Sequence, residues 1–379
     1  MDPVLAYAQA CQPRIVDFIR QLVECESPSD DPAAVNRFHD LFAGSVRDIA
    51  SNIKTVSGGA KYGKHLLIEF ALPGRVKRGE GQILALGHGD TVYPMGTLQS
   101  TPFRADDDKL WGPGVIDMKG GLAFFVFAMR ALRELDIPVS RKVVLQINSD
   151  EEVGSESSRS LTEASARKSR AVLVLEPGTG QEGKLKTARK GVGDYTVVVR
   201  GKAAHAGVDF TAGASAILEA SRQVLKIAEF TDLRKGTTVN PGVINGGTRT
   251  NVIAETAVVE VDMRVAKLSE AARLDKKFRA LKPVDKRCSL EVTGGLNRPP
   301  MERTKGIVEL FRLAKKLGWN VEESSTGGGS DGNFTAALGV PTLDGIGAVG
   351  LGAHTPHEHL FIARIADRTA LLAKLVAAI

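Results

Sequence analysis

Continuously apolar runs alternate with amphipathic segments along the first half of the chain. Apolar runs typical of strands buried on both faces of a parallel sheet lie at 82–87, 143–147 and 171–175. Apolar residues at helical spacing indicate helices at 3–24, 32–49, 120–135 and 156–167. Because strands and helices alternate, we predict an α/β domain in which a mixed, mostly parallel sheet carries helices on both faces.

The pattern changes near residue 190 and changes back near residue 300. Between these points, strand-like and helical segments follow one another in a βαββαβ-like order, which is typical of a small α+β domain. Helical spacing then returns at 303–317 and 362–378. We therefore expect a discontinuous catalytic domain of residues 1–189 and 300–379, with residues 190–299 inserted as a lid.

Composition limits the classes of partner. The 379 residues exceed one ordinary core, which agrees with two domains. The net charge is +6, but the basic residues are scattered and only 5% of residues are aromatic, so no nucleic-acid partner is expected. The chain contains neither a membrane-length apolar run nor a signal-peptide pattern, and its three cysteines lack metal spacing. We predict a cytoplasmic protein without a membrane partner.

Residues that bind divalent cations follow the predicted strands. In open α/β sheets, ligands bind beyond the carboxyl ends of the strands, so recurrence there indicates a metal site. Taken singly, each residue has a structural explanation, such as helix capping by Asp117 or a solvated turn at 150–152. Alternation along a strand would place Asp90 beside His88 and orient its imidazole. The candidates are His88, Asp90, Asp117, Glu151, Glu152 and Glu176.

Two glycine-rich stretches, at 178–183 and 345–350, match GxGxxG. Each follows a predicted strand, but neither opens a helix or has an acidic residue about twenty positions further on, as a dinucleotide site requires. A nicotinamide-dependent dehydrogenase is therefore not favoured.

Eight motifs between residues 87 and 358 resemble, in order, those of the co-catalytic dizinc exopeptidases and deacylases. This family includes glutamate carboxypeptidase, aminoacylase and succinyl-diaminopimelate desuccinylase. The resemblance is strongest to bacterial glutamate carboxypeptidase of the folate-cleaving type. The motifs are GHGDTV, WGPGVIDMKGGL, NSDEEVGS, LEP, GKAAHAG, GGTRTN, TGGGSDG and GLGAH followed by Glu358.

The resemblance implies two zinc ions per subunit, with manganese or cobalt as tolerable substitutes. It assigns His88 and Glu176 to one ion and Glu152 with a C-terminal histidine to the other. Asp117 would bridge the ions, and Asp90 would orient His88. The family pattern of a histidine four residues before a glutamate selects His354, with His357 as the alternative and His359 as a surface residue.

The resemblance also implies the catalytic and substrate groups. Glu151 would be the general base for a water held between the two ions. His205 would stabilise the oxyanion in the active site of a partner subunit, within a homodimer formed through the lid. A clamp for the terminal carboxylate of the substrate would comprise Lys184, Asn251, Arg264, Arg298 and the backbone at Gly328 and Gly329.

The sequence thus predicts a zinc-dependent exopeptidase that releases a C-terminal amino acid, with glutamate preferred, from a peptide or an N-acyl group. An aminoacylase or other N-acyl-amino-acid deacylase, or a di- or tripeptidase, is the alternative within the family. A metal-free binding protein on the same scaffold is the alternative outside it.

Overall fold

The computed structural model describes residues 2–76, 79–318 and 320–379. It divides into two compact units. The core unit comprises residues 1–188, 303–326 and 330–379, and the inserted unit comprises residues 189–302 and 327–329. The inserted unit includes the glycines at 327–329 because Arg189 Nη1 donates hydrogen bonds to the carbonyl oxygens of Gly328 and Gly329.

The main sheet of the core unit has the strand order β1-β2-β6-β3-β7-β14. Strand β3 runs parallel to both β6 and β7, and β14 runs parallel to β7, whereas β1 and β2 form an antiparallel edge. The sheet is therefore mixed and mostly parallel, which confirms the predicted fold class. Its strands are β1 (Ala50–Val56), β2 (His65–Phe70), β3 (Gln82–His88), β6 (Lys142–Asn148), β7 (Ser169–Val174) and β14 (Thr342–Leu343).

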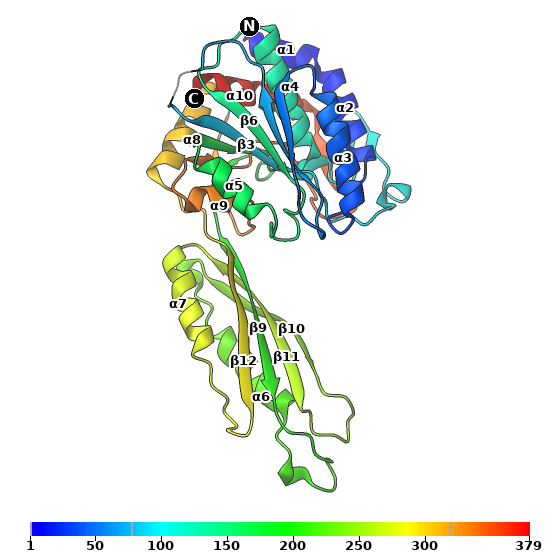
Figure 1. Cartoon of the computed structure of the whole chain (residues 1–379), viewed down its shortest axis with the longest axis vertical. Coiled ribbons are helices and arrows are strands. Elements are labelled where there is room, and N and C mark those ends of the chain that lie inside the picture. The colour runs from blue at the N-terminus through cyan, green and yellow to red at the C-terminus, as the bar shows by residue number, and fades with distance from the viewer. Residues whose placement is uncertain (1, 77–78, 319) are drawn as a thin grey trace. The chain divides into compact units, whose positions relative to one another are not determined.

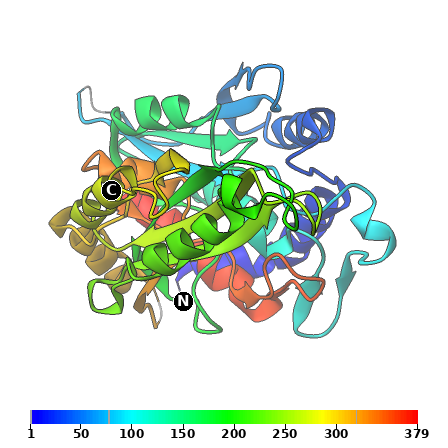
Figure 2. The same ribbon diagram turned by 90° about the horizontal axis from the view of Figure 1, so that it is seen from below.

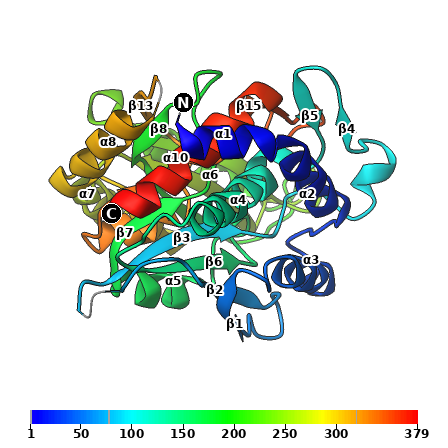
Figure 3. The same ribbon diagram turned by 90° about the horizontal axis from the view of Figure 1, so that it is seen from above.

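Helices cover both faces of this sheet, as Figure 3 shows for α4 and α10 on one side and α5 on the other. The pleat of β3 explains how both faces are filled, because alternate residues point to opposite sides. Ile83 and Ala85 belong to the apolar cluster that contains α4 and α10, whereas Leu84 and Leu86 pack with Ala166 of α5. These helices are α4 (Gly120–Glu134), α5 (Arg159–Ala166) and α10 (Ile365–Ala378).

Two features of the core unit differ from the sequence pattern. The helix expected at 3–24 is broken at Cys11, because Pro13 has no N–H to donate and instead occupies the first turn of a new helix. Two small sheets, β15-β16-β5-β4 and β13-β8, are added to the predicted one, and the strands of the first are only two or three residues long, too short to show a period of two. The remaining elements are α1 (Pro3–Ala10), α2 (Gln12–Glu24), α3 (Pro32–Ser45), β4 (Arg104–Ala105), β5 (Lys109–Trp111), β8 (Leu185–Arg189), α8 (Lys305–Leu317), β13 (Glu323–Thr326), α9 (Gly332–Ala337), β15 (Gly350–Leu351) and β16 (His359–Phe361).

The inserted unit is an antiparallel sheet of order β10-β11-β9-β12 with two helices on one face (Figure 1, Figure 2). Alternate residues of β9, including Tyr195, Val197 and Val199, share one apolar cluster with residues of both helices. The ring of Tyr195 stacks on Phe278 with centroids 3.8 Å apart. The elements are β9 (Gly191–Arg200), α6 (Ala216–Ala228), β10 (Thr238–Gly246), β11 (Thr256–Val265), α7 (Leu268–Arg279) and β12 (Ser289–Arg298).

The helices of the described residues were compared with the requirements for a membrane-spanning segment. None of them combines the length and the apolar character that crossing a bilayer requires.

Two helical glycines of the core unit provide a paired stability test. A Cβ atom at Gly121 would lie 2.1 Å from the carbonyl oxygen of Leu175, whereas a Cβ at Gly44 would meet nothing within 4 Å. We expect Gly121→Ala to lower the free energy of unfolding by about 1–3 kcal/mol through overpacking. Gly44→Ala should leave it unchanged or raise it by up to about 1 kcal/mol, because alanine is the better helix former. Urea unfolding of both variants measures the difference in their free energies of unfolding. Equal changes in the two variants would contradict the close approach of Gly121 to the carbonyl oxygen of Leu175.

Candidate metal centre and active site

The central strands bring most of the predicted metal ligands to one edge of the main sheet. Strands β6, β3 and β7 are adjacent and parallel, so their carboxyl ends meet there. His88 is the last residue of β3 and pairs in register with Asn148, the last residue of β6. The loop after β6 carries Glu151 and Glu152, and Glu176 follows β7.

Asp117 lies between two imidazole rings. Its Oδ1 is 3.3 Å from Nε2 of His88, and its Oδ2 is 3.3 Å from Nε2 of His354. His88 Nε2 is also 3.6 Å from Glu176 Oε1, and His354 Nε2 is 3.2 Å from Glu152 Oε2. Each carboxylate oxygen of Asp117 thus faces a separate group of one imidazole and one further carboxylate.

Buried polar atoms test whether this cluster suits metal ions. His88 is 2% exposed. His88 Nε2, Asp117 Oδ1 and Glu152 Oε1 have no hydrogen-bond partner among the described residues. Buried polar atoms that make an ion-pair contact at most, as His88 Nε2 and Asp117 Oδ1 do at 3.3 Å, are costly unless a cation binds them. Ligand atoms of His88, Asp117 and Glu152 lie within 4.8 Å of one another, as do those of His88, Glu151 and Glu176. This donor set of imidazoles and carboxylates fits divalent metals.

The electrostatics of the cluster also favour positive charge. Hydrogen bonds with Asp117 and Glu152 raise the pKa of His354 to about 11. Burial raises the pKa of Glu152, because the desolvated carboxylate is less stable in its charged form. The carboxylates therefore stabilise a cation beside them, whether that cation is a proton or a metal ion.

Asp90 contacts His88 in a different way from the one expected. The Nδ1 of His88 lies 2.9 Å from the backbone carbonyl oxygen of Asp90 and 3.5 Å from its carboxylate. The carboxylate of Asp90 instead accepts hydrogen bonds from the N–H groups of Glu151 at 3.2 Å and Glu152 at 3.1 Å. It also accepts one from the Ser29 hydroxyl at 2.8 Å. Asp90 thus joins the end of β3 to the loop after β6.

Of the three C-terminal histidines, His354 is the one beside Glu152 and Asp117. Its backbone adopts φ = 63°, in the left-handed region that non-glycine residues seldom occupy. The ring of His359 stacks on Trp111 with centroids 4.4 Å apart, and its Nδ1 lies 2.8 Å from the carbonyl oxygen of His357. The geometry therefore favours His354 over its alternative.

Glu358 acts on the backbone near Asp117, a contact that the motif alone did not reveal. Its carboxylate accepts hydrogen bonds from the N–H groups of Gly114 at 3.1 Å, Ile116 at 2.8 Å and Asp117 at 3.1 Å. Burial raises the pKa of Glu358 to about 7. The residue thus holds the turn that presents Asp117.

The two glycine-rich stretches meet at a buried arginine of α10. The guanidinium of Arg368 donates to the carbonyl oxygens of Gly347 at 2.9 Å, Gly183 at 3.0 Å and Gly345. The N–H of Gly347 in turn donates to the carbonyl oxygen of Glu176 at 2.9 Å. These glycines therefore support the backbone at Glu176. Each stretch leads into a strand, β8 or β15, whereas the glycines of a dinucleotide site lead into a helix.

The inserted unit brings together candidates that are distant in sequence. The N–H of Ala206, next to His205, donates to the carbonyl oxygen of Asn251 at 2.9 Å. A Cβ at Gly329 would lie 2.8 Å from Cδ of the buried Arg298. Arg189 also contacts two clamp candidates, because it donates hydrogen bonds to the carbonyl oxygens of Gly328 and Gly329. No motif in the sequence predicted this role for Arg189.

The other two clamp candidates have local ionic partners. Arg264 lies on β11 and binds Asp262 two residues earlier, at 2.8 Å from Nη2 to Oδ1. Lys184, in the core unit, pairs with Glu322 at 3.0 Å.

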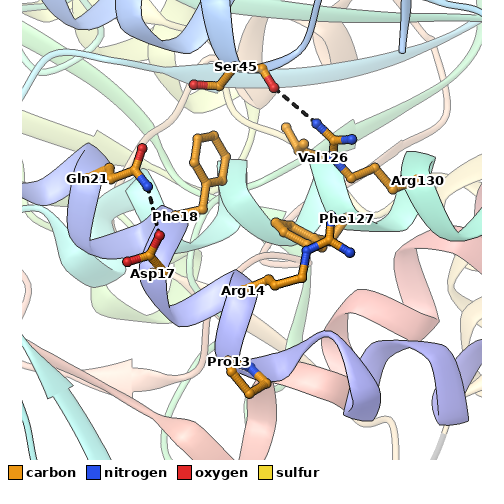
Figure 4. A pocket seen from close by; sticks show the side chains of 9 residues that line it. All are labelled: Pro13, Arg14, Asp17, Phe18, Gln21, Ser45, Val126, Phe127 and Arg130. Atoms are coloured by element: carbon orange, nitrogen blue, oxygen red, sulfur yellow. Dashed lines mark hydrogen bonds between the residues drawn. The ribbon is translucent and has the colours of Figure 1, made fainter. Parts of the chain in front are cut away.

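A separate crevice of about 430 Å³ lies between α2, the end of α3 and α4 (Figure 4). Its floor includes the rings of Phe18 and Phe127. Arg130 contacts the carbonyl oxygen of Ser45 and pairs with Asp48. None of the predicted site residues is among those that line it.

An α/β sheet that gathers imidazoles and carboxylates at its carboxyl edge in this way is typical of a protein that binds divalent metal ions. Comparison with known proteins agrees with this class. The chain belongs to peptidase family M20/M25/M40, whose model matches residues 84–378. It is therefore a hydrolase of the metallopeptidase and amidohydrolase type.

Individual relatives support the same family. The chain is 29% identical over 375 residues to carboxypeptidase G2 of Pseudomonas sp. strain RS-16, covering 96% of this chain and 89% of that protein. It is 27% identical over 271 residues to acetylornithine deacetylase of Klebsiella pneumoniae strain 342, covering 66% and 68%. Its fold resembles that of the YXEP protein of Bacillus subtilis, a dinuclear metal binding peptidase from the M20 family. The TM-score is 0.70, with 15% identity and coverage of 98% of each chain.

Metal analysis of two histidine variants tests the ligand assignment. We expect His354→Ala to lower bound metal from roughly two ions per chain to roughly one, because a structural or catalytic metal needs about three to four protein ligands. His357→Ala, three residues away, should keep both ions. Elemental analysis after dialysis measures the metal content. Loss of an ion in the His357 variant alone would reverse the assignment.

Proposed function

We propose that the protein is a zinc-dependent exopeptidase that hydrolyses the amide bond to a C-terminal amino acid, with glutamate preferred. The observation that carries this proposal is the placement of Asp117, with one carboxylate oxygen toward His88 and the other toward His354. Similarity to carboxypeptidase G2 along 96% of the chain supports the reaction type.

His88 and Glu176 would hold one ion, Glu152 and His354 the other, and Asp117 would bind both. Imidazole and carboxylate ligands suit zinc, and manganese or cobalt would also be accepted. When bound, the two ions polarise the scissile carbonyl and lower the pKa of water toward about 7. Asp90 keeps His88 oriented through its carbonyl oxygen.

Glu151 is the proposed general base. A carboxylate oxygen of Glu151 lies within 4.8 Å of ligand atoms of His88 and Glu176, and Asp90 fixes its backbone N–H. In this position it takes a proton from the attacking water and returns it to the nitrogen of the leaving amino acid.

The substrate carboxylate would be held by Lys184, Asn251, Arg264 and Arg298, with backbone groups of Gly328 and Gly329. Arg298 is the strongest of these candidates, because a guanidinium binds a carboxylate through two parallel hydrogen bonds. It is buried against Gly329, and its Nη1 lies 3.4 Å from Asn297 Oδ1. Arg264 and Lys184 would have to exchange their present partners, Asp262 and Glu322, for the substrate.

A homodimer through the inserted unit would bring His205 to the active site of the partner subunit, where it would stabilise the oxyanion. Exposed apolar side chains on α6 and on the edge strand β10 support such an interface. They are Ile217, Leu218, Leu225, Val243 and Ile244.

Disruption of this face tests the dimer. Leu225 is 71% exposed, so Leu225→Asp should leave the monomer folded while placing a charge within the interface. Analytical ultracentrifugation should show a monomer, and its activity should be at least about tenfold lower because His205 no longer reaches a partner. Leu233→Asp, at a site that is 76% exposed and outside α6 and β10, is the control. A fully active monomer would contradict the role of His205.

Deacylation of N-acyl amino acids is the alternative reaction, favoured by the similarity to acetylornithine deacetylase. The metal cluster would serve both reactions equally, as it would serve a di- or tripeptidase. The groups that hold the substrate would decide between them. We propose the cytoplasm as the location, because cysteines spaced as widely along the chain as Cys11, Cys25 and Cys288 suit a reducing compartment.

Replacement of the proposed base tests the mechanism. Glu151→Gln should lower kcat by about 10²–10⁴-fold, because the amide cannot accept the proton, while both metal ions remain bound. Glu163→Gln, which removes a partly exposed carboxylate paired with Arg159 on α5, is the matched control and should be fully active. Wild-type activity in the Glu151 variant would eliminate this mechanism.

The same assay measures substrate choice. The α-amide of an N-acylglutamate should not be cleaved, because the clamp requires the terminal α-carboxylate. N-acylglutamine keeps that carboxylate, so the expected preference for N-acylglutamate over it measures whether the basic residues of the clamp also bind the side-chain carboxylate. Faster release from N-acetylornithine would favour the deacylase instead.

A further inference from the structure

The carboxylate of Asp331 lies at the base of the loop that carries Glu151 and Glu152. Asp331 belongs to the core unit and is 3% exposed. Its Oδ2 accepts a hydrogen bond from Nδ2 of Asn148 at 2.6 Å, and its Oδ1 accepts one from the hydroxyl of Ser155. Asn148 ends β6 and Ser155 follows the loop at 149–154, so one buried carboxylate ties the two ends of this loop together.

The hydrogen bonds that the Asp331 carboxylate accepts differ from those of an ordinary helix cap. Asp331 immediately precedes α9, at the position where an aspartate side chain commonly accepts hydrogen bonds from the first N–H groups of its own helix. Here the side chain makes no such capping hydrogen bond. Its bonds to Asn148 and Ser155 reach instead to residues 183 and 176 positions away in the sequence.

Ser155 requires such an anchor. Its backbone adopts φ = 60°, in the left-handed region that is unfavourable for a residue with a side chain, and its N–H donates to the carbonyl oxygen of Asp150 at 2.8 Å. This turn returns the chain after Glu151 and Glu152. Asp90 holds the same loop from its other side, through the two N–H groups described above.

We propose that Asp331 is a positioning residue, which directs Glu151 and Glu152 toward the metal centre by holding Asn148 and Ser155. This inference rests on the proposed function of Glu151 as the base. An ionised carboxylate accepts both hydrogen bonds strongly, and asparagine at the same site would turn an amide N–H₂ group toward one of the two donors. The loop would then shift, and a displacement of about 1 Å at a catalytic group can cost on the order of 10²-fold in rate.

Asp331→Asn tests this role. We expect kcat to fall by about 10–100-fold while KM changes by less than about threefold and both metal ions stay bound. Thr335→Val is the matched control, because Thr335 is a buried residue of α9 whose hydroxyl bonds to the carbonyl oxygen of Gly332 at 3.0 Å and to the hydroxyl of Thr342 at 2.9 Å. This control loses two buried hydrogen bonds outside the loop at 149–154, so its kcat should be that of the wild type.

A double-mutant cycle with Ser155→Ala separates positioning from general destabilisation. If Asp331 acts through Ser155, the variant that carries both Asp331→Asn and Ser155→Ala should have a kcat no lower than that of Asp331→Asn alone. If the two residues act independently, the fold-losses in kcat of the single variants should multiply in the double variant. Equal losses in the Asp331 and Thr335 variants, or multiplied losses in the cycle, would overturn the inference. If Asp331→Asn does not fold, Ser155→Ala alone decides, with about a tenfold lower kcat expected and an unchanged kcat overturning the role.

The outcome is separable from that of the proposed function. Full activity of the Glu151→Gln variant would contradict both the role of Glu151 as the base and the role of Asp331 in positioning it. A lowered kcat in the Glu151→Gln variant, together with an unchanged kcat in the Asp331→Asn variant, would contradict the positioning role alone.

Discussion

Mutual repulsion among buried carboxylates is the constraint on which the site depends. Asp117, Glu152 and Glu176 each lie 3.2–3.6 Å from an imidazole, and their side chains are only 14%, 7% and 9% exposed, beside the half-exposed His354. Such an arrangement is unfavourable unless positive charge is present between the side chains. The raised pKa of His354 shows how strongly the carboxylates attract a cation, and the unpaired atoms of His88, Asp117 and Glu152 show where ligand capacity remains.

A second group of acidic residues surrounds this cluster and has the opposite property. Both oxygens of Asp90 and both oxygens of Glu358 accept hydrogen bonds, chiefly from backbone N–H groups. Hydrogen bonds of this kind offset part of the cost of burying a carboxylate and fix the backbone that donates them. Asp90 and Glu358 therefore shape the loops, whereas Asp117 and Glu152 each keep a buried carboxylate oxygen without a hydrogen bond.

Glycines, including those of the two glycine-rich stretches, allow close backbone packing beneath the metal cluster. Gly121 and Gly347 both approach the carbonyl oxygen of Leu175 so closely that a Cβ would lie about 2 Å from it, and Leu175 precedes the metal ligand Glu176. Arg368 then collects the carbonyl oxygens of the neighbouring glycines. A pattern that suggests nucleotide binding in isolation thus serves close backbone packing beneath a metal ligand.

The order of the elements follows from the sequence, because burial of a strand or of one helix face leaves a local pattern of apolar residues. The class of chemistry and the choice of His354 over His357 follow from the motifs that resemble those of the dizinc exopeptidases. The apolar pattern does not locate the break at Cys11 or the two-residue strands, since both depend on one or two residues. Only the fold shows why His354 is suited to its role, because the left-handed turn at this residue places its imidazole beside Asp117 and Glu152. Only packing, likewise, brought Asp331 to Asn148 and Ser155 and turned the hydrogen bond of His88 to the backbone of Asp90, since distances between remote segments are not encoded in local spacing.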